Sequence, residues 1–175
     1  KEMFYRSMEE LLPIFEREGI RLEIQAHPWD FCEENNETVD IVKSFRSDNV
    51  KYVYSVPHTF FYDKGKGEVE KMLRYAGQDL SHVLIADTRN HTKHCRYIVN
   101  PPGVDAAVHQ HVAVGEGDVD FNALFSTLRD MRFAEQTFKV GGEPIVCTSL
   151  FGYPEKMKYQ AVETRELIER ELLRR

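Results

Sequence analysis

The stretch LEIQAHPWDF, residues 22–31, reads as a β-strand that runs into a loop. Its polar side chains Glu23, Gln25 and His27 alternate along the chain, so they lie on one face of the strand. In an ordinary core, each unpartnered polar group on that face would cost about 1–3 kcal/mol. The stretch therefore predicts a strand whose end opens into a wet cleft, with an edge strand that has one solvated face as the alternative.

Two further strands of this kind follow at intervals of about thirty residues, with a helical pattern in each interval. Strands are expected at 21–26, 51–56 and 81–86, and helices between them at 36–45 and 67–76. Strand–helix–strand units of this length join parallel strands by right-handed crossovers. The spacing therefore predicts an α/β fold with a parallel sheet.

Amphipathic helices are expected at both ends of the chain. Apolar side chains recur at helical spacing from Met8 to Phe15, and Gly19 follows as a C-terminal cap. Pro13 lies inside this pattern and predicts a kink or an early break. The closing helix is expected to begin at Pro154, because proline is favoured in the first turn.

A helix at 121–131 and a strand at 144–148 complete a fourth strand–helix pair. Four such pairs are half of a (β/α)8 TIM barrel, which takes about 250 residues. At 175 residues the chain has the length of one domain. Residues 1–175 are therefore expected to be the C-terminal portion of a single barrel domain that lacks its N-terminal half. A small doubly wound sheet, complete in itself, is the alternative.

The connection from 87 to 118 contains NPPG at 100–103 and GEGD at 115–118. Connections longer than about 15 residues without regular structure are uncommon and are often functional. We therefore expect this segment to contribute to a site.

Charge and composition limit the classes of partner and the cellular compartment that are expected for this protein. A formal net charge of −6 supplies no basic field for a phosphate backbone, so nucleic acid is not an expected partner. No run of about 18 apolar residues is present, so a membrane span is not expected either. The widely spaced Cys32, Cys95 and Cys147 indicate free thiols in a reducing compartment rather than a disulfide framework. A cytoplasmic protein is therefore expected.

Histidines gather where the strands of a parallel sheet would end, and strand ends carry the site in α/β proteins. Histidine transfers protons near neutral pH and is the commonest transition-metal ligand. His27 and His58 each lie beside a proline at a strand exit and are the strongest candidates, whereas His82 and Cys147 read more simply as interior residues. The full set at or near strand ends comprises Gln25, His27, Ser55, His58, His82, Asp87 and Cys147, with His109 and His111 in the long connection.

The segments LEIQAHPWDF, VYSVPHTFFYD, HVLIADTRNH, NPPGVDAAVHQH and GEGDVDF together resemble the xylose-isomerase-like TIM-barrel superfamily of sugar isomerases, epimerases and inosose dehydratases. The likeness extends over essentially all of the chain and is greatest to a protein of myo-inositol catabolism. Its members are longer than this chain, so the resemblance also implies a missing N-terminal half.

In that superfamily, four successive strand ends supply Glu, Asp, His and Glu to a divalent metal. The matching positions here carry Gln25, Ser55, Leu84 and Cys147, so all four customary ligands are absent. An amide, a hydroxyl, an alkyl group and a thiol are a poor set for a hard divalent cation. The resemblance therefore implies that the usual metal binds feebly or elsewhere.

The leading hypothesis is an isomerase, epimerase or lyase of inositol or polyol catabolism that acts on a small sugar or cyclitol. His27 and His58 would transfer protons in this enzyme. The substrate would be held by Gln25, Ser55, His82, Asp87, His111 and Cys147. A variant places zinc or manganese on His27 and His58 together with His109 or His111, and a site without metal is an equal alternative.

The runner-up hypothesis is a non-catalytic barrel that binds a sugar or a partner protein after losing the customary ligands. An endonuclease-like relative with a zinc cluster is disfavoured by the missing acidic ligands and the negative net charge. Dimers are common among such barrels, so a homodimer is one expected assembly.

Overall fold

The computed structural model describes residues 1–28, 30–63, 68–89, 109–151 and 154–173. Within this part of the chain, four strands form one parallel sheet in the order β1-β2-β3-β4. Each strand begins and ends within one residue of the bounds expected from the sequence. The strands are β1 (Leu22–Gln25), β2 (Val50–Ser55), β3 (Leu80–Ile85) and β4 (Ile145–Thr148).

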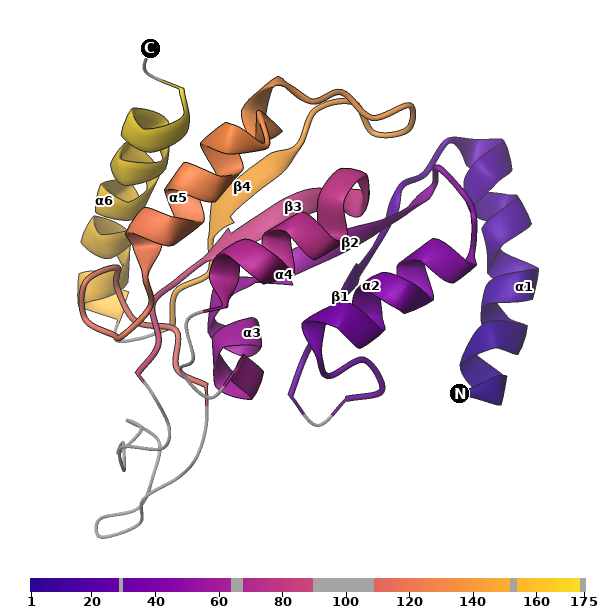
Figure 1. The fold of residues 1–175 in the computed structure, drawn as a ribbon, viewed down its shortest axis with the longest axis horizontal. Coiled ribbons are helices and arrows are strands. Elements are labelled where there is room, and N and C mark those ends of the chain that lie inside the picture. Colours follow the sequence, from indigo (N-terminus) through magenta and orange to yellow (C-terminus); the bar gives the residue numbers. More distant parts are fainter. Residues whose placement is uncertain (29, 64–67, 90–108, 152–153, 174–175) are drawn as a thin grey trace, which may run out of the picture.

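The strand order follows the chain order, so each crossover moves in the same direction along the sheet. A doubly wound sheet needs a reversal of that order, and this alternative is therefore wrong for the described residues. As a consequence, the helices of successive crossovers lie on the same face of the sheet. Figure 1 shows α2, α4, α5 and α6 side by side over this face. The helices are α1 (Glu2–Glu18), α2 (Asn35–Ser44), α3 (Val56–Asp63), α4 (Val69–Ala76), α5 (Phe121–Asp130) and α6 (Pro154–Leu172).

Helix α1 continues through Pro13, so the expected early break does not occur. Pro13 lies on the exposed side of the helix, where water can satisfy the carbonyl that loses its partner. The helix ends at Gly19 as expected, with a left-handed φ of 63°. None of the described helices is long and apolar enough to cross a lipid bilayer.

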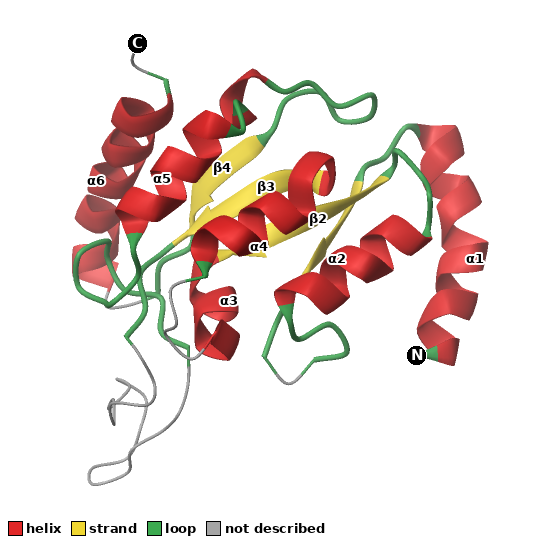
Figure 2. Cartoon of the chain, viewed as in Figure 1, coloured by secondary structure: helices red, strands yellow, loops and turns green. Residues whose placement is uncertain are grey.

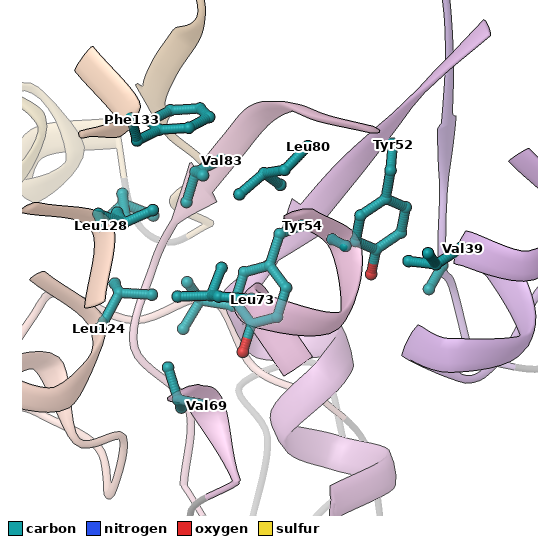
Figure 3. Close-up of a cluster of buried hydrophobic side chains, with 14 of the residues drawn as sticks. Val39, Tyr52, Tyr54, Val69, Leu73, Leu80, Val83, Leu124, Leu128 and Phe133 are labelled. Carbon is teal, nitrogen blue, oxygen red and sulfur yellow. The ribbon is translucent and has the colours of Figure 1, made fainter. Parts of the chain in front are cut away.

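The core lies between the sheet and the helix layer (Figure 3). Tyr52 and Tyr54 of β2 point toward this layer and are almost fully buried. They pack in one cluster with Leu73 of α4 and Leu128 of α5. The Tyr52 hydroxyl donates a hydrogen bond of 2.8 Å to Asn35, so its polar tip is satisfied inside the core.

The opposite face of the sheet, which we call the inner face, carries the polar residues of the strands. Side chains alternate along a strand, so residues between those of the core point to this face. In a closed barrel this face lines the interior. Its residues include Glu23, Gln25, Val53, Ser55, His82, Leu84 and Cys147.

Candidate functional site

Four imidazole rings converge at the carboxyl end of the sheet, and we call His27, His58, His109 and His111 the histidine cluster. The ring of His58 lies at its centre. Its centroid is 4.6 Å from that of His27, 4.5 Å from that of His109 and 5.1 Å from that of His111. The structure thus brings together the four histidines that the sequence proposed as metal-site candidates.

His58 lies in the first turn of α3, not at the strand-to-loop exit expected from the sequence (Figure 2). The helix begins at Val56, directly after β2 ends at Ser55. Pro57 fits there because a backbone N–H in the first turn has no intrahelical partner. The Thr59 hydroxyl donates to the Ser55 carbonyl oxygen at 2.9 Å and holds the junction. The sequence analysis did not predict α3, because a short continuous apolar run is typical of both buried strands and short buried helices.

The segment that carries His111 is anchored to the ends of two strands. Val112 and Asp87 form an antiparallel bridge with N–O distances of 2.8 and 2.9 Å. The Phe151 N–H donates to the His111 carbonyl oxygen at 2.9 Å, and the two rings stack with centroids 4.2 Å apart. The long connection therefore returns to the strand ends, as expected for a segment that contributes to the site. Its NPPG motif lies outside the described residues.

Backbone carbonyls fix the tautomers of two rings in the histidine cluster, His27 and His111, whereas Nδ1 of His58 faces both a carbonyl oxygen and the donor amide nitrogen of Gln25. A carbonyl oxygen only accepts, so a ring nitrogen that bonds to it carries the proton, and the other ring nitrogen carries a lone pair. In each case the bonded atom is Nδ1. The pairs are His58 with Ala26 at 3.0 Å, His111 with Ser149 at 2.6 Å, and His27 with Pro28 at 2.8 Å.

Nε2 of His58 lies 3.2 Å from Nε2 of His111. A proton or a cation between the two nitrogens holds them at this distance. Imidazoles that bind metal commonly donate the other ring N–H to a backbone carbonyl, and two nitrogens on a tetrahedral zinc are about 3.3 Å apart. One ligand nitrogen from each of His27, His58 and His109 also lies within 4.8 Å of the others. The cluster therefore fits a transition metal.

Burial keeps the central rings neutral. Burial, together with the neighbouring rings of His109 and His111, lowers the pKa of His58 to about 3. Burial also lowers the pKa of His109 to about 4, and it lowers the pKa of His111. Neutral imidazole is the form that binds metal. The electrostatics thus favour these three rings as lone-pair donors over proton donors at neutral pH.

The positions of the customary ligands lie at or next to the last residue of the four strands and carry no carboxylate. Ser55, Leu84 and Cys147 pair in register across β2, β3 and β4 and form one row. The Ser55 hydroxyl is buried and has no hydrogen-bond partner within the described ranges. The Gln25 amide nitrogen lies 2.9 Å from Nδ1 of His58. This row does not fit a hard cation, so the histidine cluster is the better metal site.

Asp87, which the sequence proposed as a substrate contact, is held by the loop that follows it. Its Oδ1 accepts from the N–H groups of Thr88 at 2.8 Å and Val119 at 3.2 Å. Its Oδ2 accepts from the N–H groups of Gly115 and Gly117, both at 2.9 Å. Burial raises the pKa of Asp87, and these bonds offset only part of that rise. The carboxylate therefore organises the loop and is not open to a ligand.

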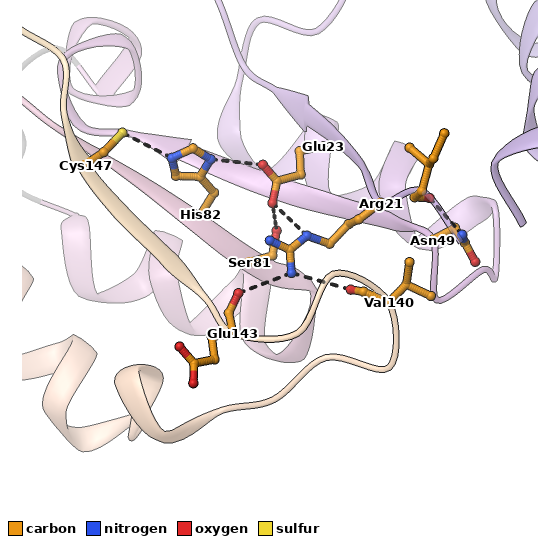
Figure 4. A network of polar contacts seen from close by, with 9 residues as sticks. Arg21, Glu23, Asn49, Ser81, His82, Val140, Glu143 and Cys147 are labelled. Atoms are coloured by element: carbon orange, nitrogen blue, oxygen red, sulfur yellow. Dashed lines mark hydrogen bonds and ion pairs between the residues drawn. The ribbon is translucent and has the colours of Figure 1, made fainter. Parts of the chain in front are cut away.

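A second polar group lies on the inner face, nearer the middle of the strands (Figure 4). Nδ1 of His82 is 2.9 Å from Glu23, and its Nε2 is 3.3 Å from Sγ of Cys147. Burial alone would lower the pKa of His82, but the bonds to Cys147 and Glu23 outweigh it and raise the pKa to about 9. His82 and Cys147 are both partly buried. Glu23 was not among the candidate site residues. Its alternation with Gln25 and His27 along the first strand was the signal that could have identified it.

Comparison with known proteins identifies a matching family and several similar solved structures. The family model described as "Xylose isomerase-like TIM barrel" matches residues 1–141. A D-tagatose 3-epimerase-like protein has a TM-score of 0.63 and 17% identity, over 96% of this chain and 52% of that chain. The IolI protein with a bound zinc atom has a TM-score of 0.58 and 21% identity, over 94% and 55%. A D-psicose 3-epimerase in the presence of D-fructose has a TM-score of 0.65 and 15% identity, over 95% and 54%. No curated protein matches.

These structural likenesses show the fold alone, and the chain spans about half the length of the solved structures that it matches. The expected α/β barrel fold, with this chain covering about half of it, is thereby confirmed. The parallel sheet, the one-sided helix layer and the match over residues 1–141 agree with one another. The chain belongs to the xylose isomerase-like TIM barrel family.

Proposed function

We propose that the protein acts on a small sugar or cyclitol as an isomerase, epimerase or lyase, with the histidine cluster as its centre. The observation that carries this proposal is the meeting of four imidazoles at the strand ends of a fold found in sugar epimerases. A role in inositol catabolism is the narrower form of the proposal, and it rests on the sequence segments that resemble proteins of that pathway.

The cluster is suited to a divalent transition metal held by His27, His58 and His109, with His111 beside His58. Zinc is favoured over manganese, because imidazole suits zinc whereas manganese prefers carboxylates and water. A bound zinc ion supplies Lewis-acid polarisation of a substrate oxygen.

In a metal-free form of the proposal, His27 is the residue for proton transfer. Its side chain is 42% exposed, and Asp30 lies 3.1 Å from Nδ1, so Nε2 is the atom left for exchange with a substrate. The pKa of His58 near 3 makes that ring too weak a base to hold a proton at neutral pH. In this form of the proposal, His58 accepts hydrogen bonds but does not transfer protons together with His27.

Zinc analysis tests the metal directly. We expect about one zinc per chain after loading and desalting, and removal of that zinc by a chelator. His58→Ala is expected to weaken zinc binding by about a hundredfold or more, because it removes the central ligand. Competition with a chromophoric chelator measures the affinity.

His82→Gln is the matched control, since His82 bonds to Glu23 and Cys147 rather than to the cluster. It should keep the zinc affinity of the unaltered protein. Zinc that stays below one-tenth of an equivalent at saturation, or equal affinity in His58→Ala, would contradict the metal site.

The non-catalytic barrel remains a second candidate, because none of the four customary ligand positions carries an acid. Incubation of sugars and cyclitols with the protein in D₂O separates the two functions, since proton-transfer enzymes exchange a substrate C–H for deuterium. Exchange in the unaltered protein that is lost in His27→Ala supports the enzyme. Ligand-induced thermal stabilisation without any exchange supports a binding protein.

A further inference from the structure

We propose that Cys147, His82 and Glu23 form a nucleophilic triad on the inner face, in which Cys147 adds to the carbonyl carbon of a small aldehyde. The thiol is the nucleophile, the imidazole moves its proton, and the carboxylate is a positioning residue for the imidazole. This site is separate from the histidine cluster and does not depend on a metal.

The three side chains stand in the order that nucleophilic catalysis requires. Sγ of Cys147 lies 3.3 Å from Nε2 of His82, within hydrogen-bond range for sulfur. On the other side of the ring, Nδ1 lies 2.9 Å from Oε2 of Glu23. The residues come from β4, β3 and β1, so the register of the parallel sheet sets their distances.

Glu23 is itself held in place by two further groups. Its Oε1 accepts from the Ser81 hydroxyl at 2.7 Å and lies 3.0 Å from Nε of Arg21. Arg21 is fixed in turn by the carbonyl oxygens of Val140 and Glu143 (Figure 4). Burial raises the pKa of Glu23, but the hydrogen bonds from His82 and Ser81 and the nearby positive charges lower it on balance. Glu23 is therefore an anion that orients and charges the His82 ring.

A charged His82 has both ring N–H groups as donors, one toward Glu23 and one toward the sulfur. Nε2 of the ring lies within reach of the thiol proton, and the thiolate that forms when the proton moves is the reactive form of the side chain. Cys147 is half-buried on the inner face. Cys32 provides the contrast within the same chain, because it is buried and burial raises the pKa of its thiol.

The aldehyde is chosen because its addition needs only a nucleophile and one proton donor, and the triad supplies both. The Sγ–C bond forms while the π bond of the C=O group breaks, and the electron pair moves to the oxygen. That oxygen takes the proton from Nε2 of His82, which had received it from the thiol. The product is a hemithioacetal, with no leaving group and no change in oxidation state.

The position of Cys147 along β4 connects the triad to the substrates of the proposed function. Ser149 follows two residues later, and its carbonyl and hydroxyl oxygens lie 2.6 and 3.2 Å from Nδ1 of His111. The open-chain forms of small aldose sugars carry an aldehyde of the kind that the triad would capture. The triad can be present whether or not the histidine cluster binds metal.

Alkylation by iodoacetamide tests the nucleophile in chelator-treated protein. Mass spectrometry of peptides gives the rate at each cysteine between pH 5.5 and 10. We expect Cys147 at pH 6 to react at least about tenfold faster than Cys32, and at least about tenfold faster than Cys147 in His82→Gln. Glu23→Gln should lower the rate at pH 6 by a smaller factor. The alkylation rates of Cys147 in all variants should become equal near pH 10, where any accessible thiol is ionised.

Lys139→Gln is the matched control, because it removes an exposed ion pair with Asp48 and leaves the inner face unchanged. It should react as the unaltered protein does. Equal rates at pH 6 in His82→Gln and the unaltered protein, or a Cys147 slower than Cys32, would overturn the triad.

A spectroscopic readout covers the case in which His82→Gln does not fold. In Cys147→Ser, the NMR titration midpoint of His82 should fall by at least about one pH unit, because the stabilising sulfur is lost. An unchanged midpoint would refute the pairing of sulfur and imidazolium.

Glyceraldehyde is the probe for the aldehyde class. At millimolar concentration it should slow the alkylation of Cys147 severalfold and leave Cys32 unaffected, whereas glycerol should slow neither. An equal lack of protection by both compounds would overturn the aldehyde assignment. His58→Ala should lose zinc but keep the Cys147 rate, so failure of one proposal can be told from failure of the other.

Discussion

Replacing Asp87 with asparagine is expected to lower the free energy of unfolding by about 3 kcal/mol. Asp87 is 1% exposed, and its two carboxylate oxygens accept four backbone N–H groups. Asparagine has one oxygen and one NH₂ group, so two backbone donors would face a donor. Each buried N–H left unpaired costs about 1–3 kcal/mol. Urea unfolding, followed by circular dichroism, measures the change.

Asp120→Asn is the control for the chemical change itself. Asp120 caps α5 by accepting one hydrogen bond, from the Ala123 N–H at 2.9 Å. Asparagine caps helices about as well as aspartate does, so this variant should stay within about 0.5 kcal/mol of the unaltered protein. If Asp87→Asn loses no more stability than Asp120→Asn, the carboxylate does not organise the loop as described.

The same substitution should disturb the histidine cluster. The backbone of Asp87 forms the bridge to Val112, next to His111. The glycines of the GEGD segment permit this packing, because a Cβ on Gly117 would lie 2.2 Å from Oδ1 of Asp87. We therefore attribute these glycines to the Asp87 loop, a role that the sequence did not reveal.

The periodic pattern of the sequence was sufficient to predict the sheet. Strand bounds depend on apolar runs separated by helices, and both signals are local. The bounds of β1, for example, differ by one residue at each end from those expected. The parallel arrangement also follows from local information, because a crossover of this length cannot join antiparallel neighbours by a hairpin.

Contacts between distant segments could not be predicted in the same way. The triad of Glu23, His82 and Cys147 depends on sheet register, and a shift by one residue would turn a side chain to the other face. β2 and β3 have such an irregularity between Tyr52 and Val53. Asp87 was placed in the site because it follows a strand, but its partners come from residues about thirty positions later.

Acidification of the metal-free protein is expected to cost stability between pH 6.5 and pH 3, because of the buried rings of the histidine cluster. The pKa of His58 is about 3 when folded and about 6.5 when unfolded. The unfolded chain therefore binds more protons in this window, and stability rises with pH. At pH 5 the loss from His58 alone is about 2 kcal/mol, at about 1.4 kcal/mol per pH unit. His109, with a pKa of about 4, acts in the same direction.

Urea unfolding at pH 7.5 and pH 5, with a chelator present, measures this loss while most carboxylates stay ionised. His58→Gln cannot titrate, so it should lose about 2 kcal/mol less than the unaltered protein over the same range. Zinc at a hundred times its dissociation constant should add about 2.7 kcal/mol at pH 7.5. Most of this gain should persist at pH 5, because His58 and His109, with pKa values of about 3 and 4 in the folded protein, are still largely neutral there and free to bind zinc. If His58→Gln loses as much stability as the unaltered protein between pH 7.5 and pH 5, the His58 ring is not buried as described.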